Sequence, residues 1–112
     1  MDEIGFYGHW RIVEMEMWDQ DFIDAEVQGY FHFDDDDGGE FQFGYVHGYM
    51  DCRWTTKNGK DFVEFSFEGN DEMDPTSGRG FATIEKNVLD GRLFFHEGDE
   101  SGFKASKKND KK

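Results

Sequence analysis

The stretch that decides the fold is FVEFSFEGNDEMDPTSGRGFATI, residues Phe62 to Ile84. Apolar and polar residues alternate from Phe62 to Glu68, and they alternate again from Arg79 to Ile84. Strict alternation is typical of a β-strand that is buried on one face. An acidic turn, Glu68 to Asp74, separates the two segments and is closed by the only proline, Pro75. The stretch therefore predicts a β-hairpin that contributes one face to the core.

The same alternation recurs on both sides of this hairpin. Further strands are predicted at residues 10–18, 25–33, 40–54, 89–96 and 102–106. The turn signals between them are DDDDGG at 34–39, Asn-Gly at 58–59, Lys-Asn at 86–87 and EGDES at 97–101. Residues 10–22 also fit a helical spacing, although the alternation favours a strand. Residues 19–24 are a polar connection with room for one helical turn.

Seven or eight short strands with tight turns predict an all-β fold in a single domain spanning residues 1–106. Consecutive antiparallel strands must close on themselves or fold over to protect their edges. We therefore expect an up-and-down barrel of about eight strands, with a small β-sandwich as the alternative. Such a barrel is either filled by side chains or holds one small ligand. The Lys-rich segment 107–112 is predicted to be disordered from its composition.

Aromatic residues supply the expected core, because the chain has 13 Phe and very little Leu. On the central strand, Val63, Phe65 and Phe67 share the inward face. The inward positions predicted for the first two strands are Val13, Met15, Met17, Val27, Gly29, Phe31 and Phe33. Five other aromatic residues fall on the outward face: Tyr30, Tyr45, Phe62, Phe81 and Phe94. Such a patch indicates a homo-oligomeric interface, a wide lumen, or local inversions of the assigned faces.

The charge and cysteine content exclude several classes of protein. Asp and Glu outnumber Lys and Arg by 26 to 12, which gives a net charge of −14. Nucleic acids and anionic membranes are therefore poor partners. A single cysteine, Cys52, allows no internal disulfide, and the N-terminus lacks signal-peptide features, so we expect a soluble, cytoplasmic protein. We predict no cofactor, because nucleotide-binding motifs are absent, and no metal, because the His and Cys residues lack ligand spacing.

Gly8-His9-Trp10, at the start of the first strand, resembles the Gly-x-Trp element of calycin barrels, the group of lipocalins and avidin-like proteins. The resemblance implies an up-and-down barrel in which Trp10 closes one end. It also implies that the tryptophan packs against a basic residue of a late strand, for which Lys104 is the candidate.

Three longer segments resemble a family of small uncharacterised bacterial proteins. They are GEFQFGYVHGYMDCR (39–53), FSFEGNDEMDPTSGRGFA (65–82) and GRLFFHEGDESGFKA (91–105). This family implies no activity. Its motif includes the glycines beside Arg79 and the charged residues around His96.

Candidate ligand-binding residues concentrate in these segments. The acidic turn carries four carboxylates and one amide, which suit either a hard cation or a solvated turn whose side chains bond their own backbone. Arg79 is expected either to pair with Glu68, Asp71 or Glu72, or to bind an anionic ligand. His96 lies near carboxylates and a hydroxyl in the chain. The full set of candidates is Trp10, Glu68, Asp71, Glu72, Arg79, His96, Asp99 and Ser101.

Together these features predict a non-catalytic β-barrel module that binds a small molecule or a protein partner, with no catalytic residue assigned. The first alternative is a small hydrolase-like enzyme that uses Glu68, Asp71, Arg79, His96 and Asp99. The second alternative is a structural or assembly protein.

Overall fold

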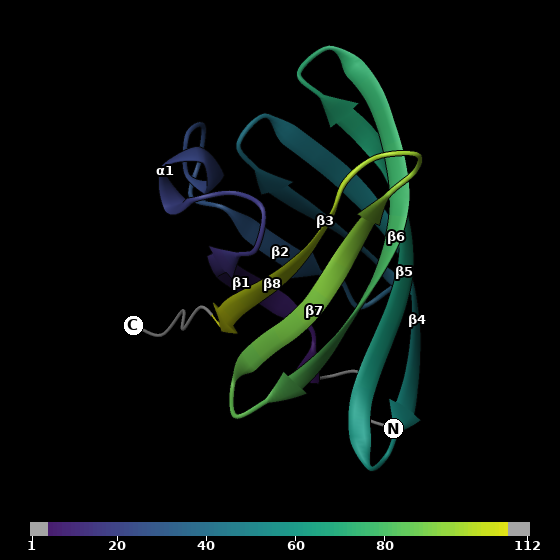
Figure 1. Ribbon diagram of the computed structural model, residues 1–112. Coiled ribbons are helices and arrows are strands. Elements are labelled where there is room, and N and C mark those ends of the chain that lie inside the picture. The colour runs from purple at the N-terminus through teal and green to yellow at the C-terminus, as the bar shows by residue number, and fades with distance from the viewer. Residues whose placement is uncertain (1–4, 108–112) are drawn as a thin grey trace.

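Eight antiparallel strands follow one another around a closed barrel in the computed structural model, which describes residues 5–107 (Figure 1). The elements are β1 (Gly8–Met15), α1 (Gln20–Ile23), β2 (Tyr30–Phe33), β3 (Gly38–Phe43), β4 (Val46–Lys57), β5 (Lys60–Asp71), β6 (Asp74–Glu85), β7 (Val88–Phe95) and β8 (Glu100–Lys107). Each strand pairs with the next, and β1 pairs with β8 to close the sheet. The predicted up-and-down barrel is therefore confirmed. No helix within residues 5–107 is long and apolar enough to cross a membrane.

The interior of the barrel is filled by aromatic rings. Phe31 lies among them: its ring centroid is 4.4 Å from that of Phe103 and 5.2 Å from that of Phe41. All three side chains are buried, as are Phe65 and Phe67. An eight-stranded barrel is just wide enough for side chains to fill it, and aromatic rings occupy that space with few residues. We expected a barrel that is either filled by side chains or holds one small ligand, and this barrel is filled by side chains.

Glycines make room for these rings on the neighbouring strands. Phe65 of β5 lies directly opposite Gly80 of β6, and Phe67 lies opposite Gly78. A Cβ atom added at Gly80 would lie 2.7 Å from Cζ of Phe65. The absence of a side chain on β6 therefore lets each ring lie across the strand beside it, and this couples the curvature of the sheet to the packing of the core.

The calycin resemblance implies that Trp10 closes one end of the barrel, and its side chain is buried in the core. Its Nε1 donates to the carbonyl oxygen of Phe6 at 2.9 Å. The basic residue against its ring is Lys107, whose Nζ lies 4.7 Å from the ring centroid. Lys104 was the expected partner, but it points outward from β8 and pairs with Asp90 at 3.2 Å. Residues two apart on a strand share a face. Lys107 is three residues after Lys104, so its side chain lies on the opposite, inward face of β8. Residues 108–112 of the predicted tail lie outside the described residues.

The helical turn α1 lies beside the other end. Asp19 is its N-cap, and its Oδ1 accepts a hydrogen bond from the backbone N–H of Phe22 at 3.0 Å. Trp18 packs on Phe43, with ring centroids 4.9 Å apart. The polar connection at 19–24 thus holds the single helical turn for which the sequence has room.

The first strand differs from the prediction in length and in facing. It ends at Met15, and its pairing with β8 shifts between Ile12 and Glu14. Such a bulge adds one residue to the strand, so the inward face changes from even to odd positions. Ile12 and Met15 are buried, whereas Val13 and Met17 are 40% and 51% exposed. The prediction that Val13 and Met17 face the core was wrong.

Two further strand assignments need correction. The predicted strand at 25–33 is regular only over Tyr30–Phe33, so Val27 is exposed rather than inward. The predicted strand at 40–54 is two strands, because the chain turns at Gly44-Tyr45, where Gly44 has φ +58°. After this turn Val46 faces the core, as expected for residues beyond Gly44, and Tyr45 is exposed.

The acidic turn is shorter than predicted. β5 continues to Asp71 and β6 begins at Asp74, which leaves Glu72 and Met73 as the tip of the hairpin. Glu68 is paired within the sheet, opposite Ser77. Pro75 lies in β6 opposite Asn70. The tip of the β5–β6 hairpin lies at the top of Figure 1, beyond β7, which pairs with β6 only from Gly78 to Glu85.

The single cysteine gives a pH-dependent prediction for stability. Burial in β4, reinforced by Asp51 and other nearby carboxylates, raises the pKa of Cys52 from 9.0 to about 12. Above pH 9 the unfolded thiol ionises while the folded thiol stays protonated, so the unfolded state binds fewer protons. The stability contributed by Cys52 is therefore complete below pH 9 and is lost as pH rises towards 12.

This prediction is checked by urea unfolding at about pH 8 and about pH 10.5, with Cys52→Ala as the matched variant. We expect the free energy of unfolding to fall more steeply with pH for the wild type, by up to about 1.4 kcal/mol per pH unit. Equal pH slopes for the two proteins would contradict the assignment.

Candidate functional site

The outer face of β4 to β7 carries a continuous open groove. Four depressions overlap along it: Ser66 lines three of them, Ser77 lines three, and the one lined by both Arg79 and Phe81 has a volume of about 390 Å³. The residues that define this Arg79 groove are Tyr49, Ser66, Glu68, Ser77, Arg79 and Phe94.

Strand register brings these residues together. Asp51, Ser66, Arg79 and Phe94 lie in one row across four neighbouring strands. Tyr49, Glu68 and Ser77 form the next row. Directly opposed residues on one face have Cβ atoms about 4.5–5.5 Å apart, so each row is a set of side-chain neighbours. The alternation in the sequence predicts that these positions point outward, and the register adds which of them are adjacent.

Arg79 lies at the centre of the groove and is exposed. Its guanidinium carbon is 5.6 Å from the centroid of the Phe94 ring. The other three arginines each pair with carboxylates: Arg11 with Asp24, Arg53 with Asp51, and Arg92 with Glu16 and Glu100. Within the described part of the chain, Arg79 alone among the arginines forms no ion pair.

Within residues 5–107, Arg79 forms no ion pair with a carboxylate of the acidic turn, so the predicted pairing was wrong. The residue opposite Arg79 on β5 is Ser66, and Glu68 lies one row further along. Asp71 and Glu72 are further still, at the tip of the hairpin. These carboxylates are near Arg79 in the sequence, but the antiparallel register of β5 and β6 separates them along the strands.

Three of the five outward aromatic residues form a strip beside the groove. Phe62, Phe81 and Phe94 cross β5, β6 and β7 diagonally, with successive ring centroids 5.7 and 6.1 Å apart. Their side chains are half-buried. Tyr30 lies instead on β2, where its ring stacks on His9, and Tyr45 lies in the β3–β4 turn. The predicted patch of five is therefore a strip of three and two separate tyrosines.

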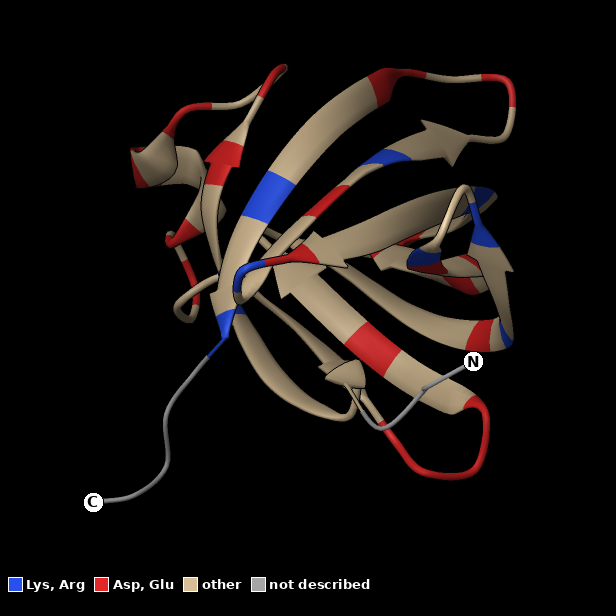
Figure 2. Cartoon of the chain, turned by 90° about the horizontal axis from the view of Figure 1, so that it is seen from below, with Lys and Arg blue, Asp and Glu red and all other residues tan. Residues whose placement is uncertain are grey.

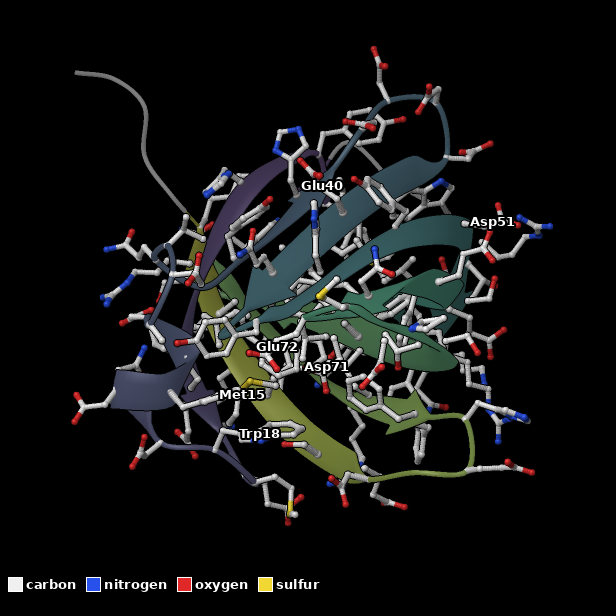
Figure 3. All side chains as sticks on the ribbon, turned by 90° about the horizontal axis from the view of Figure 1, so that it is seen from above. Met15, Trp18, Glu40, Asp51, Asp71 and Glu72 are labelled. Carbon is white, nitrogen blue, oxygen red and sulfur yellow. The ribbon has the colours of Figure 1, made fainter. Side chains whose placement is uncertain are left out.

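The remaining outward candidates lie in three places. Glu68 and His96 line the end of the groove that includes Tyr49. Asp71 and Glu72 lie at the β5–β6 tip, away from Asp51 in Figure 3. Asp99 lies in the β7–β8 turn, where its carbonyl oxygen accepts from the N–H of Phe95 at 2.9 Å. The five residues of the hydrolase alternative are thus spread over one groove and two turns.

Trp10 and Ser101 face away from the groove. Ser101 is fully buried, and its Oγ accepts from the N–H groups of Glu16 and Met17, both at 3.1 Å. The same hydroxyl donates to the carbonyl oxygen of Gly102 at 2.9 Å. Both hydrogen bonds that the hydroxyl accepts therefore hold the chain just after β1, and the one that it donates stays within β8.

Replacement of Ser101 by alanine is expected to lower the free energy of unfolding by about 1–3 kcal/mol, because it removes a buried hydroxyl that accepts the partly buried hydrogen bond from the N–H of Met17. Chemical denaturation measures the change. Ser66→Ala is the matched control, since Ser66 is exposed, and its effect is expected within about 0.5 kcal/mol. An equal effect of the two substitutions would show that the buried hydroxyl has no special role.

Charge is distributed unevenly over the molecule. Acidic positions occupy many of the connecting loops in Figure 2. The groove instead contains both signs, with Arg53 and Arg79 beside Asp51, Glu64 and Glu68. No group of three or more His, Cys, Asp or Glu side chains within residues 5–107 is arranged to hold a metal ion.

The fold and the groove define a closed, filled β-barrel with a polar and aromatic outer face. Comparison of the chain with protein-family models, curated proteins and solved structures found no match. The resemblance to small bacterial proteins therefore stays a prediction. Tyr49, Ser66 and Phe94 were missed as site residues, although their outward alternation on the strands around Arg79 was a usable signal.

Proposed function

We propose that this protein is a non-catalytic binding module whose ligand occupies the Arg79 groove and presents a carboxylate or phosphate group to Arg79. The observation that supports this most directly is the pairing of the arginines. In a chain of net charge −14, Arg79 forms no ion pair within the described residues, although four carboxylates line the same groove.

The chemistry of the guanidinium group supports the same conclusion. An arginine carries five N–H donors in a planar fork that matches the oxygens of carboxylates and phosphates. The guanidinium carbon of Arg79 lies over the Phe94 ring, an apolar surface that takes up none of these N–H donors in a conventional hydrogen bond. The hydroxyls of Ser66 and Ser77 flank it on neighbouring positions and offer further donors. Because the barrel interior is packed, the outer face is the surface on which a ligand fits.

The proposal is tested by following backbone amide resonances during titration with sodium benzoate and with inorganic phosphate, each at constant ionic strength. We expect the shifts to concentrate at Ser66, Ser77 and Phe94. Arg79→Ala should weaken binding at least about tenfold, which corresponds to about 1.4 kcal/mol. Its side chain is exposed, so the fold should be retained.

Lys104→Ala is the matched control, because it removes one positive charge from β8, outside the groove. It should leave binding nearly unchanged. Equal binding by wild type and Arg79→Ala, or shifts spread over the whole surface, would refute the proposal.

A further inference from the structure

We infer that the ligand of the Arg79 groove is an oligosaccharide that carries an isolated carboxylate. The inference rests on the proposed function and adds the chemical class of the ligand. It follows from the length of the groove, the side chains in it, its charge, and the position of its aromatic rings.

The groove is long enough for a chain of rings. Its walls include Glu64 at one end of the β5 segment and Glu68 at the other. These two residues are four positions apart, and four steps along a strand cover about 13 Å at about 3.3 Å each. A single small anion on Arg79 would leave most of this length unoccupied.

The backbone beneath the groove has no free edge. Every strand from β4 to β7 is paired on both sides in the closed barrel. A peptide therefore has no open strand edge to extend, and its own N–H and C=O groups would find few backbone partners. A ligand of this face is held by side chains alone.

These side chains suit a ligand rich in hydroxyl groups. Glu64 and Glu68 form no ion pair within residues 5–107, so their oxygens are free to accept hydrogen bonds. Arg79 and the two serines of the groove act as donors. Sugar hydroxyls both donate and accept, so they can satisfy the two kinds of group in alternation.

The charge of the groove disfavours strongly charged polymers. Four carboxylates, from Asp51, Glu64, Glu68 and Glu97, line the groove with two guanidinium groups, from Arg53 and Arg79. A polycation would meet both arginines, and a polyanion would meet the net charge of −14. One carboxylate positioned at Arg79 on an otherwise neutral ligand is complementary to this pattern.

Aromatic surfaces lie on both sides of Arg79. Tyr49 is 56% exposed at one end of the groove, and the half-buried ring of Phe81 lies towards the other, in the row of Glu64. An aromatic face presents a flat apolar surface, which suits the C–H face of a sugar ring. Rings separated along the groove would hold different sugars of one chain.

The experiment uses the full-length protein and isothermal titration with four probes. These are a xylo-oligosaccharide bearing one glucuronic acid, the unsubstituted xylohexaose, polygalacturonate and a lysine-rich peptide. We expect the glucuronic-acid-bearing probe to bind at least about tenfold more tightly than xylohexaose. Arg79→Ala should reduce its affinity to that of xylohexaose, and polygalacturonate and the peptide should bind more weakly.

Tyr49→Ala should abolish binding of the oligosaccharides, whereas Tyr45→Ala should not, because Tyr45 is an exposed tyrosine in a turn outside the groove. Equal loss in both variants would overturn the inference. So would preferential binding of the lysine-rich peptide. If benzoate shifts the groove resonances and neither oligosaccharide binds, the ligand class is wrong and the proposed function stands. If no probe binds and benzoate causes no local shift, both fail.

Sedimentation at high concentration tests a second copy of this chain as the occupant of the same face. A dimer that is lost in Phe81→Ala, in a protein that binds no oligosaccharide, would replace the inference with self-association.

Discussion

Replacement of Gly80 by valine is expected to abolish cooperative folding of the barrel. A Cβ atom at this position would lie 2.6 Å from the carbonyl oxygen of Arg92 and 2.7 Å from Cζ of Phe65. The first contact is with backbone of β7, and the second is with a buried ring in the core. Neither can move without breaking strand pairing or displacing packed aromatic side chains. We expect a loss of about 4–5 kcal/mol or more, which is a large fraction of the roughly 5–15 kcal/mol that stabilises a typical domain.

The measurement is urea unfolding followed by circular dichroism, with Gly80→Ala as an intermediate substitution. The control is Gly5→Ala, because a Cβ at Gly5 would meet only a side-chain atom of Ile84 at an ordinary 3.7 Å. The control should change stability by less than about 1 kcal/mol. A Gly80→Val protein with the wild-type midpoint would show that the sheet adjusts at β6, contrary to the packing described.

Replacement of Phe31 by alanine is the second change with a large expected effect. The ring is fully buried and contacts four others, those of Phe33, Phe41, Phe65 and Phe103. Removing it leaves a cavity in a closed barrel, whose hydrogen-bonded strands limit how far the walls can collapse. The expected cost is about 3–5 kcal/mol.

Phe62→Ala is the matched control for this prediction. Phe62 also contacts another ring, that of Phe81, but it lies half-buried on the outer face, so its loss leaves no internal cavity. Its expected cost is about 1–2 kcal/mol. Equal destabilisation by the two substitutions would mean that the barrel interior is less tightly packed than the ring contacts indicate.

The regular hairpins could be predicted from the sequence because their signals are local. Alternation over Phe62 to Glu68 and the Asn-Gly turn at 58–59 specify strands and a turn through neighbouring residues. The inward face of β5, β6 and β7 was predicted correctly for the same reason. The errors in strand assignment occurred where the same local signal, such as a glycine, is compatible with two different structures. Residues 40–54 were predicted as one strand, but the chain turns at Gly44, where a side chain would meet the ring of Phe22.

The first strand shows a different limit. Its shift between Ile12 and Glu14 arises in the pairing of β1 with β8, which are separated by most of the chain. No feature of residues 10–18 specifies that shift, because it is set by the register needed to close the barrel. The same closure brings Lys107, rather than Lys104, onto the ring of Trp10.

For the candidate site, composition and motif indicated Arg79, Glu68 and His96 but not their arrangement. Arg79 is close to four carboxylates in the sequence, and pairing with them was the simplest expectation. Antiparallel register instead placed a serine opposite it and a phenylalanine ring beneath it. This unpaired arginine is the basis of the proposed function.

The sequence alone determined that this protein is an acidic, aromatic-rich, all-β chain of about eight strands, because alternation, turn residues and charge act over short distances along the chain. Only the tertiary structure decided that the interior is filled, that β1 contains a bulge, and that Arg79 has no ion pair within residues 5–107. The physical reason is closure of the sheet. The register that joins β1 to β8 and aligns β4 to β7 depends on all strands at once, and it determines which side chains become neighbours.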